Sequence, residues 1–513
     1  MHPKHFFSAL AGSALLILLT GTLPASADVK LPGLFSDHMV LQMGAPIRIW
    51  GWADPGEQVT VVCGGNSGKV TADANGKWML RLPPVKSTEP FAIKVQGKNA
   101  VTIEDVVMGE VWVASGQSNM EFGLGGAFEA EKHIEAADNA KIRLFTVPKL
   151  RSDKPVDDIK AHWEVCSPDS ARRFSAVAYF FARDLQKARQ VPIGVIHTSW
   201  GGSPAEVWMS EKVLSSNPDY KRDILDAYPA QLDKFKKAVA QWEKESAAAK
   251  AEGKEFKKNK PWASWKPCEL YNGMIAPLIP FSIKGAIWYQ GESNAGRAWE
   301  YRSLMADLIR NWRHDWNQGK FEFFQVQLAP FMAIKDQPSE SSWAELREAQ
   351  NIAAKSVGNA GVAVITDVGE EKDIHPKKKE PVGARLALAA RGIAYHEKIE
   401  YSGPIYKKLK IKGDKAILSF DHIGSGLTAK DGALKGFAIC GEDKKWVWGK
   451  AEIDGDNVVV SSSSISKPVA VRYGCADFPV VNLWNKDGLP ASPFRTDDFE
   501  MITKPKPKTI ARN

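Results

Sequence analysis

The chain has 513 residues, which is too long for a single hydrophobic core and predicts two to four domains. Its hydrophobic content of 44% and charged content of 25% are those of a globular protein and exclude a wholly disordered chain. The formal net charge of +8 is small for this length and the basic residues are mostly scattered, so we predict no nucleic-acid partner.

The first 27 residues have the composition of a secretory signal peptide. Lys4 gives a short basic region, residues 9–19 are apolar, and residues 25–27 form the small-residue cleavage sequence Ala-Ser-Ala. A membrane anchor is the alternative, because residues 6–23 are long enough to span a bilayer. The Gly, Ser and Thr in this stretch favour cleavage. We therefore expect an exported protein, periplasmic or extracellular, with no membrane contact once the signal peptide is removed.

Residues 28–105 are predicted to form a small all-β module. The stretch IRIWGWADPGEQVTVVC alternates apolar and polar residues around a Pro-Gly turn. Asn75-Gly76, a dipeptide favoured in hairpins, precedes a further strand-like stretch, GKWMLRLPPV. This module contains no group of residues with an obvious chemical role.

From residue 106 to about residue 400, short apolar segments alternate with segments of helical period. Five apolar segments are predicted to be strands: DVVMGEVWVAS, VPIGVIHTSW, IKGAIWYQG, FEFFQVQLAP and GVAVITDVG. Residues 176–190 and 300–313 repeat apolar side chains with the spacing of one helix face. Nearly continuous apolar strands suit a parallel sheet that is covered on both faces. The segment is therefore predicted to be an α/β domain with its site at the carboxyl ends of the strands.

Residues 229–260 interrupt this alternation and are rich in Ala, Lys and Glu, which predicts an exposed helical insertion. A lid over the site is one interpretation, and a surface helix without that role is the favoured one. After residue 400, strands with a period of two return and predict a second β module over residues 401–505. Residues 506–513 form a tail that we expect to be frayed.

Polar or glycine-rich turns follow three of the predicted strands, and a histidine follows the last strand. In chain order these positions bring Gln117 and Ser118, then Gly201 and Gly202, then Gln290, Glu292 and Asn294, then Asp373 and His375. Because the carboxyl ends of parallel strands meet at one edge of a sheet, these residues are expected to lie close together.

Acyl transfer by a serine requires a hydroxyl, a base within hydrogen-bond reach, a carboxylate that orients the base, and donors for the oxyanion. Ser118 is the predicted nucleophile, His375 the base and Asp373 the orienting carboxylate. Each of these residues by itself is more often a turn or surface residue. The prediction therefore depends on their joint placement at the ends of separate strands.

The predicted oxyanion donors are the backbone N–H of Ser118, the backbone N–H of Gly201 or Gly202, and the side-chain amide of Asn294. Glycine suits positions 201 and 202, because the absence of a Cβ lets an acyl oxygen approach the amide. Three polar residues at the same strand ends are candidates for lining the pocket: Gln117, Gln290 and Glu292.

The segments GQSNM, SWGGSPAEVW, WYQGESNA and DIHP resemble the sialate O-acetylesterase family, which belongs to the SGNH hydrolases. The segments LFSDHMVLQ, GWADPGEQV and VNLWNKDGLPASPFRTD also resemble that family, so the resemblance covers nearly all of the chain after residue 27. It implies a flavodoxin-like, three-layer α/β domain with a parallel sheet, flanked by the two β modules. It also implies Ser118 as nucleophile, His375 as base, and Gly201 or Gly202 with Asn294 at the oxyanion hole.

One departure from the SGNH pattern concerns the acid. The wider class commonly has an acidic residue three positions before the histidine, where this chain has Lys372. Asp373 is the nearest carboxylate and is adopted as the orienting residue. The alternatives for that role are Glu370, Glu371 and Glu292.

Other catalytic motifs are missing from the sequence. No G-x-S-x-G motif surrounds Ser118, which argues against an α/β-hydrolase. The chain has no H-E-x-x-H motif and its five cysteines form no C-x-x-C pair, so we predict no metal and no cofactor. One or two disulfides are compatible with an oxidising compartment.

The leading hypothesis is a metal-independent serine esterase that removes O-acetyl groups from sugars through an acetyl-enzyme, with O-acetylated sialic acid as the substrate that the resemblance implies. A deacetylase of plant polysaccharides such as acetylated xylan is the alternative within the same chemistry. A glycan-binding protein without turnover is the alternative from another class. In each case the expected partner is a sugar.

Overall fold

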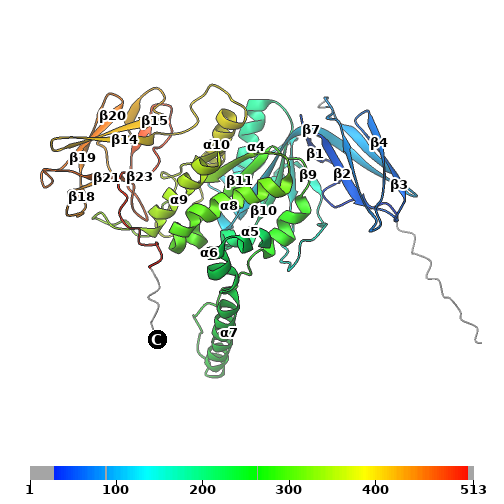
Figure 1. The fold of residues 1–513 in the computed structure, drawn as a ribbon, viewed down its shortest axis with the longest axis horizontal. Helices are drawn as coiled ribbons and strands as arrows, with labels where there is room; N and C mark the ends of the chain where they lie inside the picture. The colour runs from blue at the N-terminus through cyan, green and yellow to red at the C-terminus, as the bar shows by residue number, and fades with distance from the viewer. Residues whose placement is uncertain (1–27, 87–88, 263, 507–513) are drawn as a thin grey trace, which may run out of the picture.

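A computed structural model describes residues 28–86, 89–262 and 264–506 (Figure 1). The predicted signal peptide, residues 1–27, lies outside the described residues, as does most of the predicted tail, residues 507–513. Within the described part of the chain, no helix combines the length and apolar composition that crossing a bilayer requires.

The N-terminal region is built mainly from antiparallel strand pairs, and one long strand joins it to the rest of the molecule. Its strands are β1 (Val40–Gln42), β2 (Ile47–Trp52), β3 (Gln58–Cys63), β4 (Asn66–Thr71), β5 (Lys77–Leu82), β6 (Phe91–Gln96) and β7 (Ala100–Gly116). β7 pairs with β6 at its start and with two central strands at its end. The predicted domain boundary at residue 105 falls inside β7, where its residues change from alternately exposed to continuously buried.

The central sheet continues from β7. Its other strands are β8 (Asn139–Thr146), β9 (Trp163–Cys166), β10 (Ile193–Ser199), β11 (Gly285–Tyr289), β12 (Glu322–Val326) and β13 (Ala360–Ala363). The order is β13-β12-β11-β7-β10-β8-β9. The five predicted strands are confirmed and pair in parallel, and among themselves they have the order 2-1-3-4-5 that flavodoxin-like sheets share.

The prediction of a purely parallel sheet is wrong at one edge. β8 and β9 extend the sheet beyond β10, and β9 pairs antiparallel with β8. β9 has only four residues, WEVC, and so lacks the long apolar run that marked the other strands. The central sheet is therefore mixed.

Helices lie on both faces of the central sheet (Figure 1). Alternate residues of β7 belong to different apolar clusters: Trp112 packs in the cluster that contains α4 (Ala176–Arg189) and α10 (Glu380–Ala389). Val113 packs in the cluster that contains α8 (Ala298–Trp316) and α9 (Ser342–Val357). This alternation follows from the period of two in a strand.

The two segments predicted as amphipathic helices are confirmed as α4 and α8. Their periodic apolar side chains are fully buried: Val177, Phe180, Phe181 and Leu185 in α4, and Leu304, Leu308, Ile309 and Trp312 in α8. Shorter helices are α1 (Ser118–Glu121), α2 (Ala130–Glu135), α3 (Pro168–Arg173), α5 (Glu211–Ser216) and α6 (Pro218–Tyr220). Single 3₁₀ or π turns are η1 (Leu124–Gly126), η2 (Ala205–Trp208), η3 (Lys221–Leu225), η4 (Tyr271–Ile275), η5 (Ala276–Leu278), η6 (Glu292–Arg297) and η7 (Ala390–Ala394).

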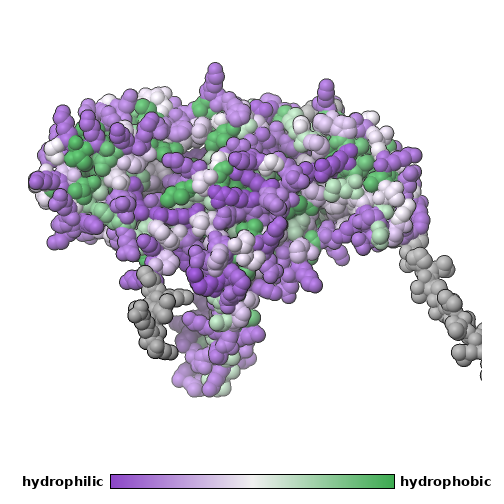
Figure 2. Space-filling view, in the orientation of Figure 1, coloured by the Kyte–Doolittle hydropathy of each residue, from purple (hydrophilic) through white to green (hydrophobic). Residues whose placement is uncertain are grey.

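Helix α7 (Tyr228–Ala251) projects from the body of the molecule, and no residue in it is buried (Figure 1). Figure 2 shows that its surface is mainly hydrophilic. The predicted helix over residues 229–260 is thus correct only to Ala251. Gly253 has a left-handed φ of +67° that ends the helix, and the chain then returns toward the body without helical structure.

The C-terminal region has its own apolar core between antiparallel sheets. Its strands are β14 (Ile405–Lys412), β15 (Lys415–Asp421), β16 (Leu427–Ala429), β17 (Phe437–Cys440), β18 (Val447–Trp448), β19 (Lys450–Asp454), β20 (Asn457–Ser461), β21 (Ala470–Tyr473), β22 (Leu483–Asn485) and β23 (Phe494–Arg495). Fully buried Arg347 of α9 donates hydrogen bonds to the backbone oxygens of Ala476 (2.7 Å) and Asp477 (2.9 Å). These bonds attach this region to the α/β domain.

Candidate active site

Three strands end at the same level beneath the candidate site. Ser199 of β10 and Tyr289 of β11 both lie opposite Gly116, the last residue of β7. Glycine is required at position 116, because a Cβ there would lie 2.1 Å from the Tyr289 carbonyl oxygen. The chain therefore turns directly after Gly116, and Ser118 begins the short helix α1.

Ser118 and His375 are in hydrogen-bond contact although 257 positions separate them in the sequence. His375 Nε2 lies 2.8 Å from Ser118 Oγ. Both side chains are half-buried, so the pair is within reach of a ligand. The distance is the one that proton transfer from a nucleophilic hydroxyl to a base requires.

Asp373 shapes the loop that presents His375. Its Oδ1 accepts a hydrogen bond of 2.8 Å from the backbone N–H of His375 and lies 3.6 Å from Nδ1 of the same residue. That second distance is longer than a hydrogen bond, so the carboxylate acts on the imidazole through its charge and through the loop.

The other carboxylates considered for this role have different partners. Glu370 accepts from the backbone N–H of Lys377, Glu371 accepts from that of Ile334, and Glu292 accepts from the Asn119 side chain. Among the described residues, Asp373 has the one carboxylate within 4 Å of a His375 ring nitrogen.

The electrostatic environment favours a neutral imidazole. Burial and the charge of Lys379 lower the pKa of His375, and Asp373 opposes this shift only in part. Since only the neutral ring accepts a proton from Ser118, the environment keeps His375 ready to act as a base.

Of the two glycine amides predicted as oxyanion donors, one is already bonded. A Cβ on Gly201 would lie 3.3 Å from the Cβ of Ser118, so Gly201 lies beside Ser118. The Gly201 N–H donates to Glu121 Oε2 at 2.6 Å, and Lys149 holds the other oxygen of Glu121. Within the described part of the chain, the N–H groups of Ser118 and Gly202 have no protein acceptor. Gly202 is therefore the better placed of the two alternatives.

Asn294 is buried and fixed by several hydrogen bonds. Its Oδ1 accepts from the Ala205 N–H (2.9 Å) and from Gln290 Nε2 (2.7 Å), and its Nδ2 donates to Glu206 (3.0 Å). One Nδ2 hydrogen remains for a ligand. Its role in the oxyanion hole stays a prediction, because these bonds connect it to neighbouring loops and not to Ser118.

Two of the candidate pocket residues are buried and form hydrogen bonds with the turn after β11. Gln117 and Gln290 are buried, with 3% and 0% of their surface exposed. Gln117 Oε1 accepts from the backbone N–H groups of Gly291 (3.4 Å) and Ser293 (3.3 Å). Gln290 donates to Asn294 and accepts from Tyr301 (2.9 Å). Both side chains thus hold the turn after β11 in place.

Comparison with known proteins agrees with this geometry. The model of a family described as a carbohydrate esterase, sialic acid-specific acetylesterase, matches residues 108–259 and 250–391, more than half of the chain. The chain belongs to this family. The predicted resemblance is therefore confirmed, and the protein is an esterase that acts on carbohydrate acetyl esters.

Individual relatives resemble nearly the whole of this esterase. It is 28% identical to a mouse sialate O-acetylesterase, over 91% of this chain and 93% of that protein. It is 27% identical to the human sialate O-acetylesterase, over 94% and 95%. The crystal structure of a carbohydrate acetylesterase from Xanthomonas citri is 40% identical, with a TM-score of 0.80, over 92% of this chain and all of that one.

The esterase has several residues near Ser118 that the sequence did not single out. Asn119 and Lys379 form a buried network with Glu292, and Trp262 lies beside Gly202. Lys379 belongs to a run of three lysines, which by itself indicates an exposed segment. The signal in the sequence for Asn119 is its place next to Ser118, the predicted nucleophile.

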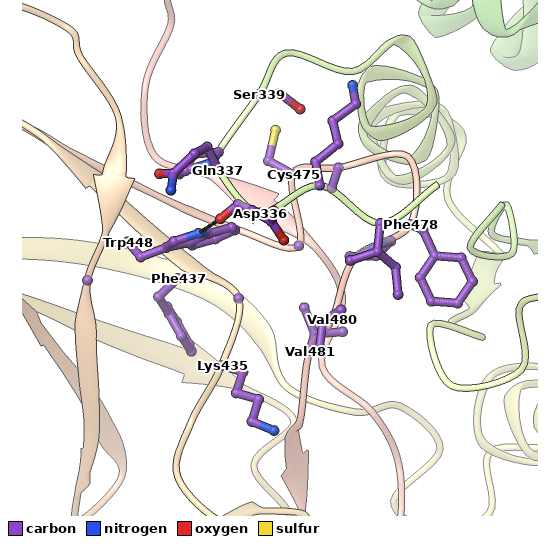
Figure 3. A pocket seen from close by; sticks show the side chains of 18 of the residues that line it. Asp336, Gln337, Ser339, Lys435, Phe437, Trp448, Cys475, Phe478, Val480 and Val481 are labelled. Carbon is purple, nitrogen blue, oxygen red and sulfur yellow. Dashed lines mark hydrogen bonds between the residues drawn. The ribbon is translucent and has the colours of Figure 1, made fainter. Parts of the chain in front are cut away.

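A separate cavity of about 360 Å³ lies between the loop before α9 and the C-terminal β region (Figure 3). Trp448, Phe437 and Phe478 are among its lining side chains, and Trp448 donates a 2.7 Å hydrogen bond to the Asp336 carbonyl oxygen. Neither Ser118 nor His375 lines it, so it is not the esterase site.

The arrangement of potential metal ligands and of the cysteines bears on two further predictions. Within the described ranges, no group of three or more His, Cys, Asp or Glu side chains is arranged to hold a metal ion. All five cysteines are described, and each is a free thiol. The disulfides considered from the sequence are therefore not formed in this structure.

Proposed function

We propose that this esterase removes O-acetyl groups from sialic acid by way of an acetyl-enzyme on Ser118. The observation that supports the serine mechanism is the 2.8 Å contact between His375 Nε2 and Ser118 Oγ. The family description and the names of the mouse and human relatives support sialic acid as the sugar. Acetylated xylan is not favoured by these comparisons.

The reaction proceeds in two halves. Ser118 Oγ attacks the acetyl carbonyl carbon while His375 Nε2 takes the hydroxyl proton, and the oxyanion accepts hydrogen bonds from the Ser118 and Gly202 N–H groups and from Asn294. The sugar oxygen leaves with the proton from His375. Water then attacks the acetyl-enzyme with His375 as base, which releases acetate and restores Ser118.

Export to the periplasm or to the outside of the cell is part of the same proposal. It is supported by the signal-peptide composition of residues 1–27.

The choice of sugar is tested by comparing substrates. We expect kcat/KM for acetate release from 9-O-acetylsialic acid to exceed that for acetyl-xylooligosaccharides by about tenfold or more, equivalent to about 1.4 kcal/mol in transition-state binding. Ser118→Ala is the control for background hydrolysis. A higher kcat/KM on the xylooligosaccharides would reject sialic acid while leaving the serine mechanism intact.

Trp262 is placed to contact the sugar. It follows α7 on the returning chain, and 70% of its surface is exposed, whereas most tryptophans of the chain are buried. A Cβ on Gly202 would lie 2.7 Å from Trp262 Nε1, so the indole lies directly beside the proposed oxyanion loop. An exposed indole combines a flat apolar face with a hydrogen-bond donor, which suits a sugar ring.

Replacing Trp262 with Ala is therefore expected to weaken the binding of sugar esters. We expect KM for an acetylated sugar to rise about tenfold, the effect of losing about 1.4 kcal/mol of contact energy. The rate on ethyl acetate, which has no sugar, should change little. Trp448→Ala, which removes another exposed tryptophan, is the matched control. Equal losses of activity on the acetylated sugar and on ethyl acetate would show that Trp262 stabilises the loop and does not contact the sugar.

A further inference from the structure

Lys379, the residue before α10, is a buried cation at the base of the site. Only 1% of its surface is exposed. Its Nζ donates to Asn119 Oδ1 at 2.5 Å and lies 5.0 Å and 5.3 Å from the ring centres of Phe122 and Tyr289. A buried ammonium is costly unless it is hydrogen-bonded and paired, so this position requires an explanation.

The partner of Lys379 connects the two catalytic segments. Asn119 follows Ser118, and its Nδ2 donates to the backbone oxygen of Ile374 (3.0 Å), the residue before His375. The same Nδ2 donates to Glu292 Oε1 (2.7 Å) at the turn after β11. One side chain thus joins the turn that carries the nucleophile to the loop that carries the base.

Lys379 helps to fix which way the Asn119 amide faces, together with the acceptors on Ile374 and Glu292. An ammonium group can only donate hydrogen bonds, so it must meet the oxygen of the amide and not its nitrogen. With Oδ1 held toward Lys379, both hydrogens of Nδ2 point to the acceptors on Ile374 and Glu292. Without the ammonium, the amide keeps these two acceptors, but its buried Oδ1 loses the donor that Lys379 supplies and the amide is held less firmly.

The charge of Lys379 also acts on His375. Burial lowers the pKa of Lys379 to about 7, while Glu292, Asp373 and Glu370 oppose that shift. Below that pH the lysine is protonated, and its charge in turn lowers the pKa of His375. Asp373 acts on His375 in the opposite direction.

We infer that Lys379 is a positioning residue, which aligns Ser118 with His375 through Asn119 and whose buried charge lies beside the loop that carries His375. This inference rests on the proposed serine mechanism. One side chain thus has two effects: the hydrogen bond to Asn119 holds the geometry, and the charge adds to burial in lowering the pKa of His375.

Two substitutions separate these effects. Lys379→Gln removes the charge and keeps a donor for Asn119, whereas Lys379→Met removes both. In each variant the acid limb of kcat/KM should move to higher pH by about half a unit to one unit, because the cation that opposed protonation of His375 is gone. On the plateau, Lys379→Met should also lose about 10- to 10²-fold in kcat, and Lys379→Gln much less.

The matched control is Lys378→Gln, which removes the same charge from an exposed neighbour and should leave the pH profile unchanged. If Lys379→Met does not fold, Lys379→Gln alone still tests the pH shift. An acid limb in Lys379→Gln that coincides with that of the wild type would overturn the inference. If Ser118→Ala were as active as the wild type, the serine mechanism itself would fail, which is a distinguishable result.

Discussion

Replacing Ser118 with Ala is expected to lower kcat for acetate release by about 10⁴-fold or more, because the acetyl-enzyme can no longer form. The residual rate would come from the oxyanion donors and from substrate binding, which the substitution leaves in place. The measurement is acetate release from an acetylated sugar under saturating conditions.

Two controls accompany this variant. The Ser118 side chain is half-buried and hydrogen-bonds to His375, so the thermal unfolding temperature should change little on losing this single contact among the described residues. A serine-directed phosphonate should form an adduct on Ser118 of the wild type, detected by mass spectrometry, and none at that position in the variant. A variant with a rate within tenfold of the wild type would contradict the proposed nucleophile.

Replacing His375 with Ala is expected to lower kcat for acetate release by a similar factor, about 10⁴-fold, because Ser118 loses the base that takes its proton. The two residues act as a unit, so Ser118→Ala with His375→Ala should be no slower than Ser118→Ala alone. Additive losses in the double variant would show that the two residues act in separate steps.

An exposed histidine provides the matched control for this second prediction. His314 lies on α8, with 71% of its side chain exposed, and bonds to its neighbour Asp315. His314→Ala should retain full activity. Added imidazole should restore part of the rate to His375→Ala, because the half-buried position leaves access for a small base.

The prediction of the strands and of two helices succeeded because periodicity is a local property. The apolar runs that end at Gly116, Ser199 and Tyr289 are long enough to identify buried strands. Strands β8 and β9 were missed, because β9 has only four residues and only half of the residues of β8 are buried. The predicted helical insertion is too long. Gly253 ends the helix, although residues of similar composition continue after it.

The pair Ser118 and His375 could be chosen from the sequence for a topological reason. In a parallel sheet, residues that follow strands share one edge whatever their separation along the chain, so Ser118 and His375 were expected to meet. The choice between Gly201 and Gly202 could not be made in this way. It depends on Glu121, whose carboxylate bonds the Gly201 amide across 80 positions of sequence.

The sequence by itself determined five strands of the central sheet, two of its helices and the placement of Ser118 and His375 at one edge of that sheet, because these follow from the spacing of neighbouring side chains and from their place after strands. Only the tertiary structure decided that Lys379 is buried while Lys377 and Lys378 beside it are exposed. The physical reason is that burial of a charge depends on its partners, and the partner of Lys379 is Asn119, 260 positions away.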